Sequence, residues 1–136
     1  RETARAAYGE VLRRTDIAFP GQGDERDLFG DDTPHAILDR LGEAGVAEIV
    51  VKLDRPGCMI STGGALTCAF AEPAAKVVDT TAAGDSFSAG YLAARLRGRD
   101  PAEAARAGQH LAAAVIGHHG AIIPRSAMPM ALRRFA

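Results

Sequence analysis

The chain has 136 residues, enough for one domain with a buried core, and its 16 basic and 17 acidic side chains give a formal net charge of −1. This balance gives no sign of a nucleic-acid partner or a charged membrane surface, and no apolar run has the length of a membrane span. No signal-peptide pattern opens the chain, so we expect a soluble, cytoplasmic protein. The chain starts Arg1-Glu2-Thr3 rather than with Met, from which we expect the C-terminal part of a longer protein.

Periodicity and capping residues predict helices and strands that alternate along the first half of the chain. Thr33 is a suitable N-cap ahead of Pro34. The near-continuous apolar run over 48–53 is typical of a strand buried on both faces of a parallel sheet. The expected elements are a helix over 2–14, a strand over 17–19, one helical turn over 24–29 ended by Gly30, a helix from Thr33 to about Ala44 with Gly45 as its C-cap, and the strand over 48–53.

The second half begins with a predicted hairpin and continues with helices. A chain in which strands alternate with helices predicts an α/β fold with a mostly parallel sheet, as one domain or part of one. The expected elements are strands over 58–62 and 65–70, a strand over 75–78, a helix over 84–97 that buries Phe87, Tyr91, Leu92 and Leu96, a helix from the N-cap Asp100 to about His118, an extended turn over 120–124 and a helix over 128–135.

The two cysteines flank the predicted hairpin turn at Gly63-Gly64. With a two-residue loop, Met59 faces Cys68 and Cys58 points to the opposite face of the sheet, which argues against a disulfide. A three-residue loop would change this parity. We expect two free thiols.

A loop of small residues between a predicted strand and a helix stands out at residues 77–90 (VVDTTAAGDSFSAG). Ala and Gly let backbone N–H groups approach an anion, and the helix start adds unpaired donors and the positive end of its dipole. Asp85 lies in the same first turn. An anion cradle that contains an acid–base group is what phosphoryl transfer to a hydroxyl requires. From spacing alone, an acidic residue that only complements the helix dipole explains the pattern equally well.

Other phosphate-binding and metal chemistries have no support in the sequence. The chain has no G-x-x-x-x-G-K-[ST] loop and no protein-kinase signature. Its only lysines are Lys52 and Lys76, so phosphate contacts must come mainly from backbone donors and arginines. The four histidines lack partners at ligand spacing and predict no metal site.

Residues 79–92 (DTTAAGDSFSAGYL) resemble the C-terminal signature of the ribokinase-like (PfkB-type) carbohydrate kinases, and further segments resemble one branch, the 2-dehydro-3-deoxygluconate (KDG) kinases. The resemblance implies that residues 1–136 are the C-terminal nucleotide-binding and catalytic part of a three-layer α/β/α domain, without the N-terminal sugar-binding part and lid. The further segments are TDIAF at 15–19, DE at 24–25 with LFG at 28–30, IVVK at 49–52, GAIIPR at 120–125 and AMP at 127–129.

The resemblance assigns the catalytic roles to the start of the 84–97 helix. Asp85 matches the base that takes the proton from the sugar hydroxyl as this attacks the γ-phosphate of ATP. Ala82, Ala83 and Gly84, with the Asp85 amide, match the anion hole for the transferring phosphoryl group. The commoner family form has Gly at the position of Ala82, which matters only if that position needs a positive φ. The KDG branch resembles this chain in carrying Ala there.

The resemblance also implies ion and nucleotide sites. Asp79 and Thr81 match positions that shape the loop and that bind a monovalent cation in some relatives; we expect the structural role. Gly57 and Gln109 match the adenine-binding region. Gly21 replaces the Asn of a family motif linked to Mg²⁺.

Near Gly21, Asp24 and Glu25 keep the acidity of that motif. Contact with Mg²⁺ through water and a solvated loop charge both fit these two carboxylates.

The resemblance therefore predicts an ATP- and Mg²⁺-dependent kinase that phosphorylates the 6-hydroxyl of 2-dehydro-3-deoxygluconate, a small sugar acid. A ribokinase or fructokinase of the same fold is the alternative within this class. A non-catalytic nucleotide-binding fragment is the alternative outside it, because the sugar-binding half is expected elsewhere. A homo-oligomer of the longer protein is compatible with either.

Overall fold

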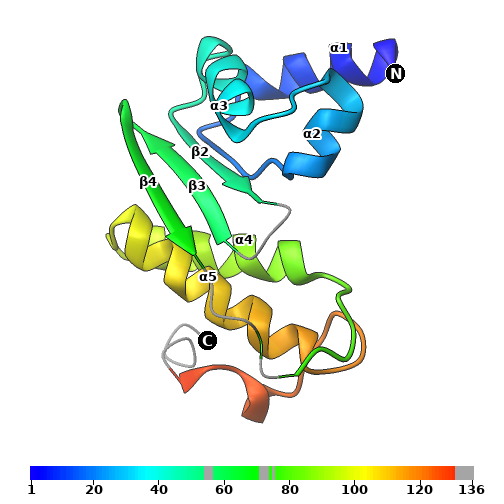
Figure 1. The fold of residues 1–136 in the computed structure, drawn as a ribbon. Coiled ribbons are helices and arrows are strands. Elements are labelled where there is room, and N and C mark those ends of the chain that lie inside the picture. The colour runs from blue at the N-terminus through cyan, green and yellow to red at the C-terminus, as the bar shows by residue number, and fades with distance from the viewer. Residues whose placement is uncertain (54–56, 71–73, 75, 131–136) are drawn as a thin grey trace. The chain divides into compact units, whose positions relative to one another are not determined.

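The computed structural model describes residues 1–53, 57–70, 74 and 76–130, and it divides into two compact units, Arg1–Cys68 and Ala69–Ala136 (Figure 1). None of the helices in these ranges is both long and apolar enough to cross a membrane. Helices and a mixed sheet give an α/β fold, as the sequence predicts.

The first unit packs three helices with a sheet of strand order β1-β2-β3-β4. Strand β1 runs parallel to β2, β2 runs antiparallel to β3, and β3 and β4 form the predicted hairpin. The parallel part of the described sheet is therefore smaller than the sequence predicts. The elements are α1 (Glu2–Leu12), β1 (Ile17–Ala18), α2 (Gln22–Phe29), α3 (Pro34–Glu43), β2 (Glu48–Lys52), β3 (Gly57–Thr62) and β4 (Ala65–Phe70), whose last two residues belong to the second unit.

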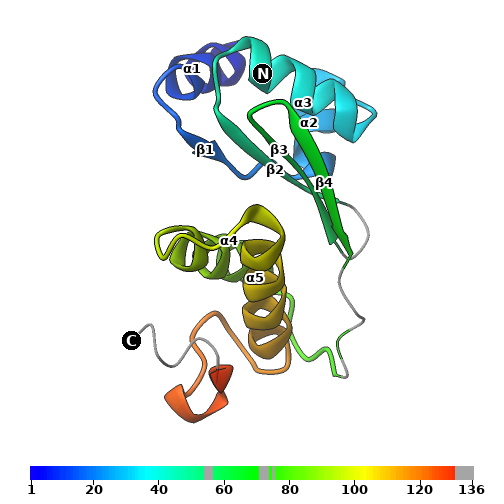
Figure 2. The same cartoon turned by 90° about the vertical axis from the view of Figure 1, so that its left-hand side faces the viewer.

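The core of this unit lies between helices α1 and α3 and strand β2, which Figure 2 shows from the side. It contains Ile37 and Leu41 of α3 and Ile49 and Val51 of β2, all at most 2% exposed. The predicted helix start at Thr33 and stop at Gly30 are confirmed, whereas α2 begins at Gln22 rather than at Asp24, and the C-cap of α3 is Ala44 rather than Gly45. The Thr33 side chain accepts a hydrogen bond from the Ala36 amide at 3.2 Å, and α2 ends at Gly30 in the left-handed conformation.

The hairpin turns through two residues, Gly63 with φ 56° and Gly64 with φ 82°. Two successive positive φ angles define the type I′ turn, which glycine adopts without steric cost. Both cysteines are free, as predicted; Cys58 is buried and Cys68 exposed. Burial raises the pKa of the Cys58 thiol to about 12, so this thiol stays protonated at neutral pH.

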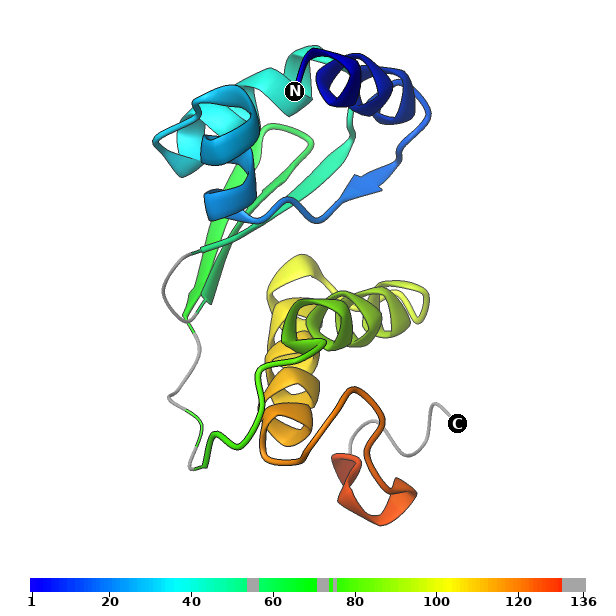
Figure 3. The same cartoon turned by 90° about the vertical axis from the view of Figure 1, so that its right-hand side faces the viewer.

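The second unit is built on two helices, α4 (Ala83–Arg95) and α5 (Pro101–Ile116), followed by a short 3₁₀ turn, η1 (Arg125–Ala127) (Figure 3). Gly90 and Gly108 let the two helices approach closely. A Cβ on Gly90 would lie 2.8 Å from the Gly108 Cα, and one on Gly108 would lie 2.6 Å from the Phe87 carbonyl oxygen. Helix α5 begins with a capping box between Asp100 and Glu103, which confirms the predicted N-cap.

Two predictions for the second unit are wrong. Residues 76–78 form no strand, because the Val78 amide donates to the Ile116 carbonyl at the end of α5 (2.7 Å) instead of to a neighbouring strand. Helix α4 buries Phe87 and Tyr91 as expected, but Leu92 and Leu96 are exposed. The predicted helix over 128–135 lies mostly outside the described residues.

Candidate active site

The loop before helix α4 ends at Ala82, whose backbone is left-handed, with φ 59° and ψ 17°. It is the one non-glycine residue with positive φ in the described part of the chain. For a residue with a Cβ this conformation costs on the order of 1–2 kcal/mol. The position at which the commoner family form has Gly does require a positive φ, and here an alanine adopts it.

The first amides of α4, which follow the left-handed residue, differ in their hydrogen bonding. The Ala83 amide donates to Thr80 at 3.2 Å and the Ser86 amide donates to Ala82 at 2.9 Å, both within the turn. No hydrogen bond joins the Gly84 or the Asp85 amide to an acceptor in the described ranges. Two adjacent, unsatisfied N–H groups at the positive end of a 13-residue helix can bind an anionic oxygen.

The carboxylate of Asp79 holds the loop before α4 through two hydrogen bonds. One oxygen accepts from the Thr81 amide at 2.9 Å, and the other accepts from the Gly120 amide at 2.8 Å. Hydrogen bonds from the Thr81 hydroxyl and from these two amides lower the pKa of Asp79 from 3.8 to about 2. Asp79 thereby ties the loop before α4 to the loop after α5.

Asp85 is the exposed carboxylate of this turn. It makes no ion pair or side-chain hydrogen bond with any described residue, whereas Ser88, one turn later, donates to the Gly84 carbonyl at 2.9 Å. A solvent-facing carboxylate next to two unsatisfied amides is the arrangement that proton abstraction beside an anion requires. The structure thus brings together Ala82, Ala83, Gly84 and Asp85.

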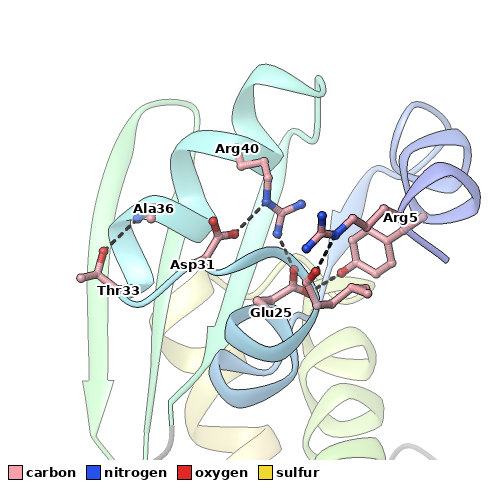
Figure 4. Close-up of polar contacts among 8 residues, drawn as sticks. Arg5, Glu25, Asp31, Thr33, Ala36 and Arg40 are labelled. Carbon is pink, nitrogen blue, oxygen red and sulfur yellow. Dashed lines mark hydrogen bonds and ion pairs between the residues drawn. The ribbon is translucent and has the colours of Figure 1, made fainter. Parts of the chain in front are cut away.

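Asp24 and Glu25, the two carboxylates that the sequence analysis links to Mg²⁺, lie in different environments. Asp24 is exposed in the first turn of α2, while Glu25 is only 3% exposed. Both Glu25 oxygens are engaged, one by the Tyr8 hydroxyl at 2.5 Å and the other by the Arg40 guanidinium (Figure 4). Glu25 is therefore not a solvated loop charge, and a water-mediated metal contact would fall to Asp24.

Tyr8, Glu25 and Arg40 form a buried cluster in the first unit, and Arg40 makes two further contacts. Its Nε donates to Asp31 at 2.7 Å, and its guanidinium carbon lies 3.8 Å from the centre of the Phe29 ring. Burial, and then the hydrogen bond to Glu25, raise the pKa of Tyr8, which keeps its hydroxyl a donor. No sequence pattern predicts the contacts among Tyr8, Glu25 and Arg40, because Tyr8 and Arg40 are 32 positions apart and the three residues form no motif.

The two adenine-site candidates lie in different units. Gly57 starts β3 with φ 135°, a value that favours glycine, and its carbonyl accepts from the Leu53 amide at 3.2 Å. Gln109 is half-buried in α5, and its side-chain amide donates to the Ala69 carbonyl at 3.1 Å. In the described ranges no group of three His, Cys, Asp or Glu side chains could hold a metal ion.

A family model for the pfkB carbohydrate kinases matches residues 1–128 of the chain. The chain belongs to this family. The pfkB-family chain is 46% identical over 132 residues to the 2-dehydro-3-deoxygluconokinase of Escherichia coli K12, a match that covers 95% of the chain and 43% of that relative. The chain therefore spans less than half the length of this curated relative.

Solved structures place the fold in the same family. An adenosine kinase from Sinorhizobium meliloti superposes with a TM-score of 0.84 at 28% identity, over 99% of the chain and 41% of that structure. A putative ribokinase II from Escherichia coli, in complex with ATP and Mg²⁺, superposes with a TM-score of 0.80 at 27% identity, over 96% of the chain and 42% of that structure. Both support the ribokinase-like α/β fold.

Proposed function

We propose that this pfkB-family chain is the catalytic part of a KDG kinase, which transfers the γ-phosphoryl group of ATP to the 6-hydroxyl of 2-dehydro-3-deoxygluconate. The observation that carries the proposal is the start of α4, where Asp85 is exposed beside the unsatisfied Gly84 and Asp85 amides. The 46% identity to a 2-dehydro-3-deoxygluconokinase supports the choice of substrate.

In the proposed step, the 6-oxygen forms a bond to the γ-phosphorus as the bond from that phosphorus to the bridging oxygen of ADP breaks. The Asp85 carboxylate accepts the proton of the hydroxyl. The Gly84 and Asp85 amides donate hydrogen bonds to the oxygens of the transferring group, whose negative charge they and the helix dipole stabilise.

Mg²⁺ would neutralise phosphate charge when bound. The exposed carboxylate of Asp24 fits a contact through water, and Glu25 does not, because Tyr8 and Arg40 already hold its two oxygens. For a monovalent cation, Asp79 and Thr81 are the candidate residues. Each Asp79 oxygen already accepts one backbone amide, so the carboxylate holds the loop without an ion.

The test uses a chimera in which this chain replaces the matched segment of the E. coli enzyme. We expect ATP-dependent phosphorylation of 2-dehydro-3-deoxygluconate, with kcat/KM at least about 100-fold above that for ribose or fructose. Asp85→Asn should lower kcat about 10²–10⁴-fold, while the thermal unfolding midpoint stays unchanged. The 136-residue chain alone should show no turnover.

Two results would overturn the proposal. A folded chimera that prefers ribose or fructose excludes the substrate. An Asp85→Asn chimera with kcat within about tenfold of the parent excludes the role of Asp85 as the base.

A further inference from the structure

Helix α2 buries a charged side chain where most helices bury apolar ones. All eight of its residues are described, and the buried one among them is Glu25. Near the other end of the helix, the Arg5 Nε of α1 donates to the Leu28 carbonyl at 2.7 Å. Surface helices ordinarily pack through a stripe of apolar residues. The place of α2 depends instead on directional polar contacts with its neighbours.

Arg40 of α3 holds α2 at two points. Its guanidinium pairs with Glu25, and its Nε donates at 2.7 Å to Asp31, which follows the C-cap Gly30 (Figure 4). The Tyr8 hydroxyl of α1 donates to the other Glu25 oxygen at 2.5 Å. A buried ion pair often contributes less to stability than apolar packing of the same volume, and its best-attested use is to select one arrangement of the elements. The cluster is therefore suited to setting the position of α2.

Asp24, the residue before Glu25, lies where two parallel strands end. Strands β1 and β2 run parallel, and Gly21 forms a parallel bridge with Lys52, the last residue of β2. The Lys52 amide also donates to the Pro20 carbonyl at 2.8 Å. Helix α2 starts directly after Gly21, so the exposed Asp24 in its first turn lies at the carboxyl ends of these strands. Ligands of open α/β sheets bind outside the carboxyl ends of the strands.

The Asp24 carboxylate occupies the space that a side chain at residue 21 would fill. A Cβ on Gly21 would lie 2.8 Å from the Asp24 Oδ2. The Gly21 backbone, with φ −90° and ψ 130°, has a conformation that any residue can adopt. Glycine is therefore needed here for the carboxylate and not for the backbone. Because the carboxylate is the far end of a flexible side chain, a Cβ at residue 21 would displace it with little strain on the fold.

We propose that Arg40, Tyr8 and Glu25 are positioning residues, which set the place of the Asp24 carboxylate at this edge of the sheet. Gly21 leaves the space that the carboxylate occupies. The proposal rests on the contact with Mg²⁺ through water that is proposed above for Asp24. Asp24 acts on the complex of Mg²⁺ and ATP, and the positioning residues act through Asp24.

The test measures ATP binding to the chimera with the E. coli enzyme by titration calorimetry, once with Mg²⁺ and once with EDTA. The ratio of the Kd in EDTA to the Kd with Mg²⁺ is the magnesium factor. We expect a factor of at least about 10 for the parent chimera, and a reduction of at least about threefold by Asp24→Asn and by Arg40→Met. A structural defect that does not involve Asp24 would weaken both affinities alike and leave the factor unchanged.

A double-mutant cycle shows whether Arg40 acts through Asp24. In the Asp24→Asn chimera, Arg40→Met should lower the factor no further, because the group that Arg40 positions is already absent. Tyr8→Phe gives the same comparison with a milder change, should Arg40→Met not fold. It removes the hydroxyl that bonds to Glu25 and keeps the ring, whose centre lies 5.3 Å from that of Phe29, and it should also lower the factor.

Three further variants separate the position of the carboxylate from general stability. Gly21→Ala should lower the factor with a nearly unchanged unfolding midpoint, because the new Cβ displaces the Asp24 carboxylate. Its control is Gly42→Ala, in α3, where a Cβ meets nothing within 4 Å and the factor should stay the same. Arg13→Met is the control for Arg40→Met, since it removes an exposed ion pair and should leave the factor unchanged.

The proposal is overturned if Mg²⁺ does not change the ATP affinity of the parent, or if the factor is unchanged in Asp24→Asn. An unchanged factor in both Arg40→Met and Tyr8→Phe, or an equal reduction by them with and without the Asp24 carboxylate, overturns it as well. An unchanged factor in Gly21→Ala excludes the role of Gly21. No measurement involves transfer to a sugar, so a chimera that does not phosphorylate 2-dehydro-3-deoxygluconate can still show the loss in Arg40→Met, and an active one can lack it.

Discussion

Helices α2 and α4 both begin with acidic first turns, but the acidic groups meet opposite environments. In α2, Glu25 is buried, with both oxygens bound by Tyr8 and Arg40. In α4, Asp85 is exposed, and it and the Gly84 amide have no partner in the described ranges. A carboxylate in the first turn of a helix is therefore buried and paired in one unit and exposed in the other.

The first turns of α2 and α4 each contain an energetically unfavourable feature. A buried carboxylate is tolerated only when its hydrogen bonds are made, so α2 depends on Tyr8 and Arg40. The start of α4 instead keeps two donors unsatisfied and holds Ala82 at positive φ. Strain and open hydrogen-bonding groups are what a pre-formed anion site contains.

The largest expected effect on stability comes from removing the partner of Glu25. Arg40→Met should lower the free energy of unfolding by about 3 kcal/mol, because it leaves a buried carboxylate with Tyr8 alone. Urea denaturation of the chain measures this. Adding Glu25→Gln should recover part of the loss, since the uncompensated charge is then removed.

An exposed ion pair provides the control for that experiment. Arg13 pairs with Glu10 on the surface of α1, with side chains 59% and 68% exposed. Arg13→Met should change the unfolding free energy by no more than about 0.5 kcal/mol. Equal effects of Arg13→Met and Arg40→Met would contradict the role of the buried cluster.

The next largest effect concerns the helix crossing that supports α4. Gly108→Ala should destabilise the chain by about 1–3 kcal/mol, because the new Cβ would lie 2.6 Å from the Phe87 carbonyl oxygen. Gly9→Ala, in helix α1 where a Cβ meets nothing within 4 Å, should instead stabilise by about 0.5–1 kcal/mol. Thermal unfolding should show a lower midpoint for Gly108→Ala and a higher midpoint for Gly9→Ala than for the parent chain. An unchanged midpoint for Gly108→Ala would show that α4 and α5 can move apart without loss of stability.

A smaller effect on the free energy of unfolding is expected from Ala82, the residue with positive φ before α4. Ala82→Gly should stabilise the chain by about 0.5–1 kcal/mol, since relief of the left-handed strain exceeds the greater entropy of unfolded glycine. Ala89→Gly, an exposed position inside α4, should cost about 1 kcal/mol. Loss of stability in both variants would indicate that Ala82 is not strained.

The smallest expected effect is the pH dependence contributed by Asp79. Its pKa is lowered from 3.8 to about 2 in the folded chain, so the carboxylate stabilises the fold above pH 4, and this stabilisation is lost as the pH falls to about 2. Asp79→Asn should flatten the decline of unfolding free energy between pH 4 and 2. The exposed Asp27→Asn serves as the control, and an unchanged slope in Asp79→Asn would contradict the assignment.

Much of the fold could be predicted from local patterns. The caps at Thr33 and Asp100 and the stop at Gly30 were predicted because each acts within one helical turn. The strand expected over residues 75–78 is wrong at 76–78, because a strand exists only with a pairing partner, and the Val78 amide donates to the end of α5 instead. Leu92 and Leu96 were expected to be buried because helical spacing shows which residues share a face and not whether anything covers it.

The sequence by itself determined the order of most elements, the glycine turn of the hairpin and the motif at 79–92, since these depend on neighbours along the chain. The structure decided that the hairpin loop has two residues. Only the tertiary structure decided which carboxylates are available. Glu25 is enclosed by Tyr8 and Arg40, residues 17 and 15 positions away, and Asp79 holds Gly120 across 41 positions. Such contacts depend on packing between elements, which local periodicity does not encode.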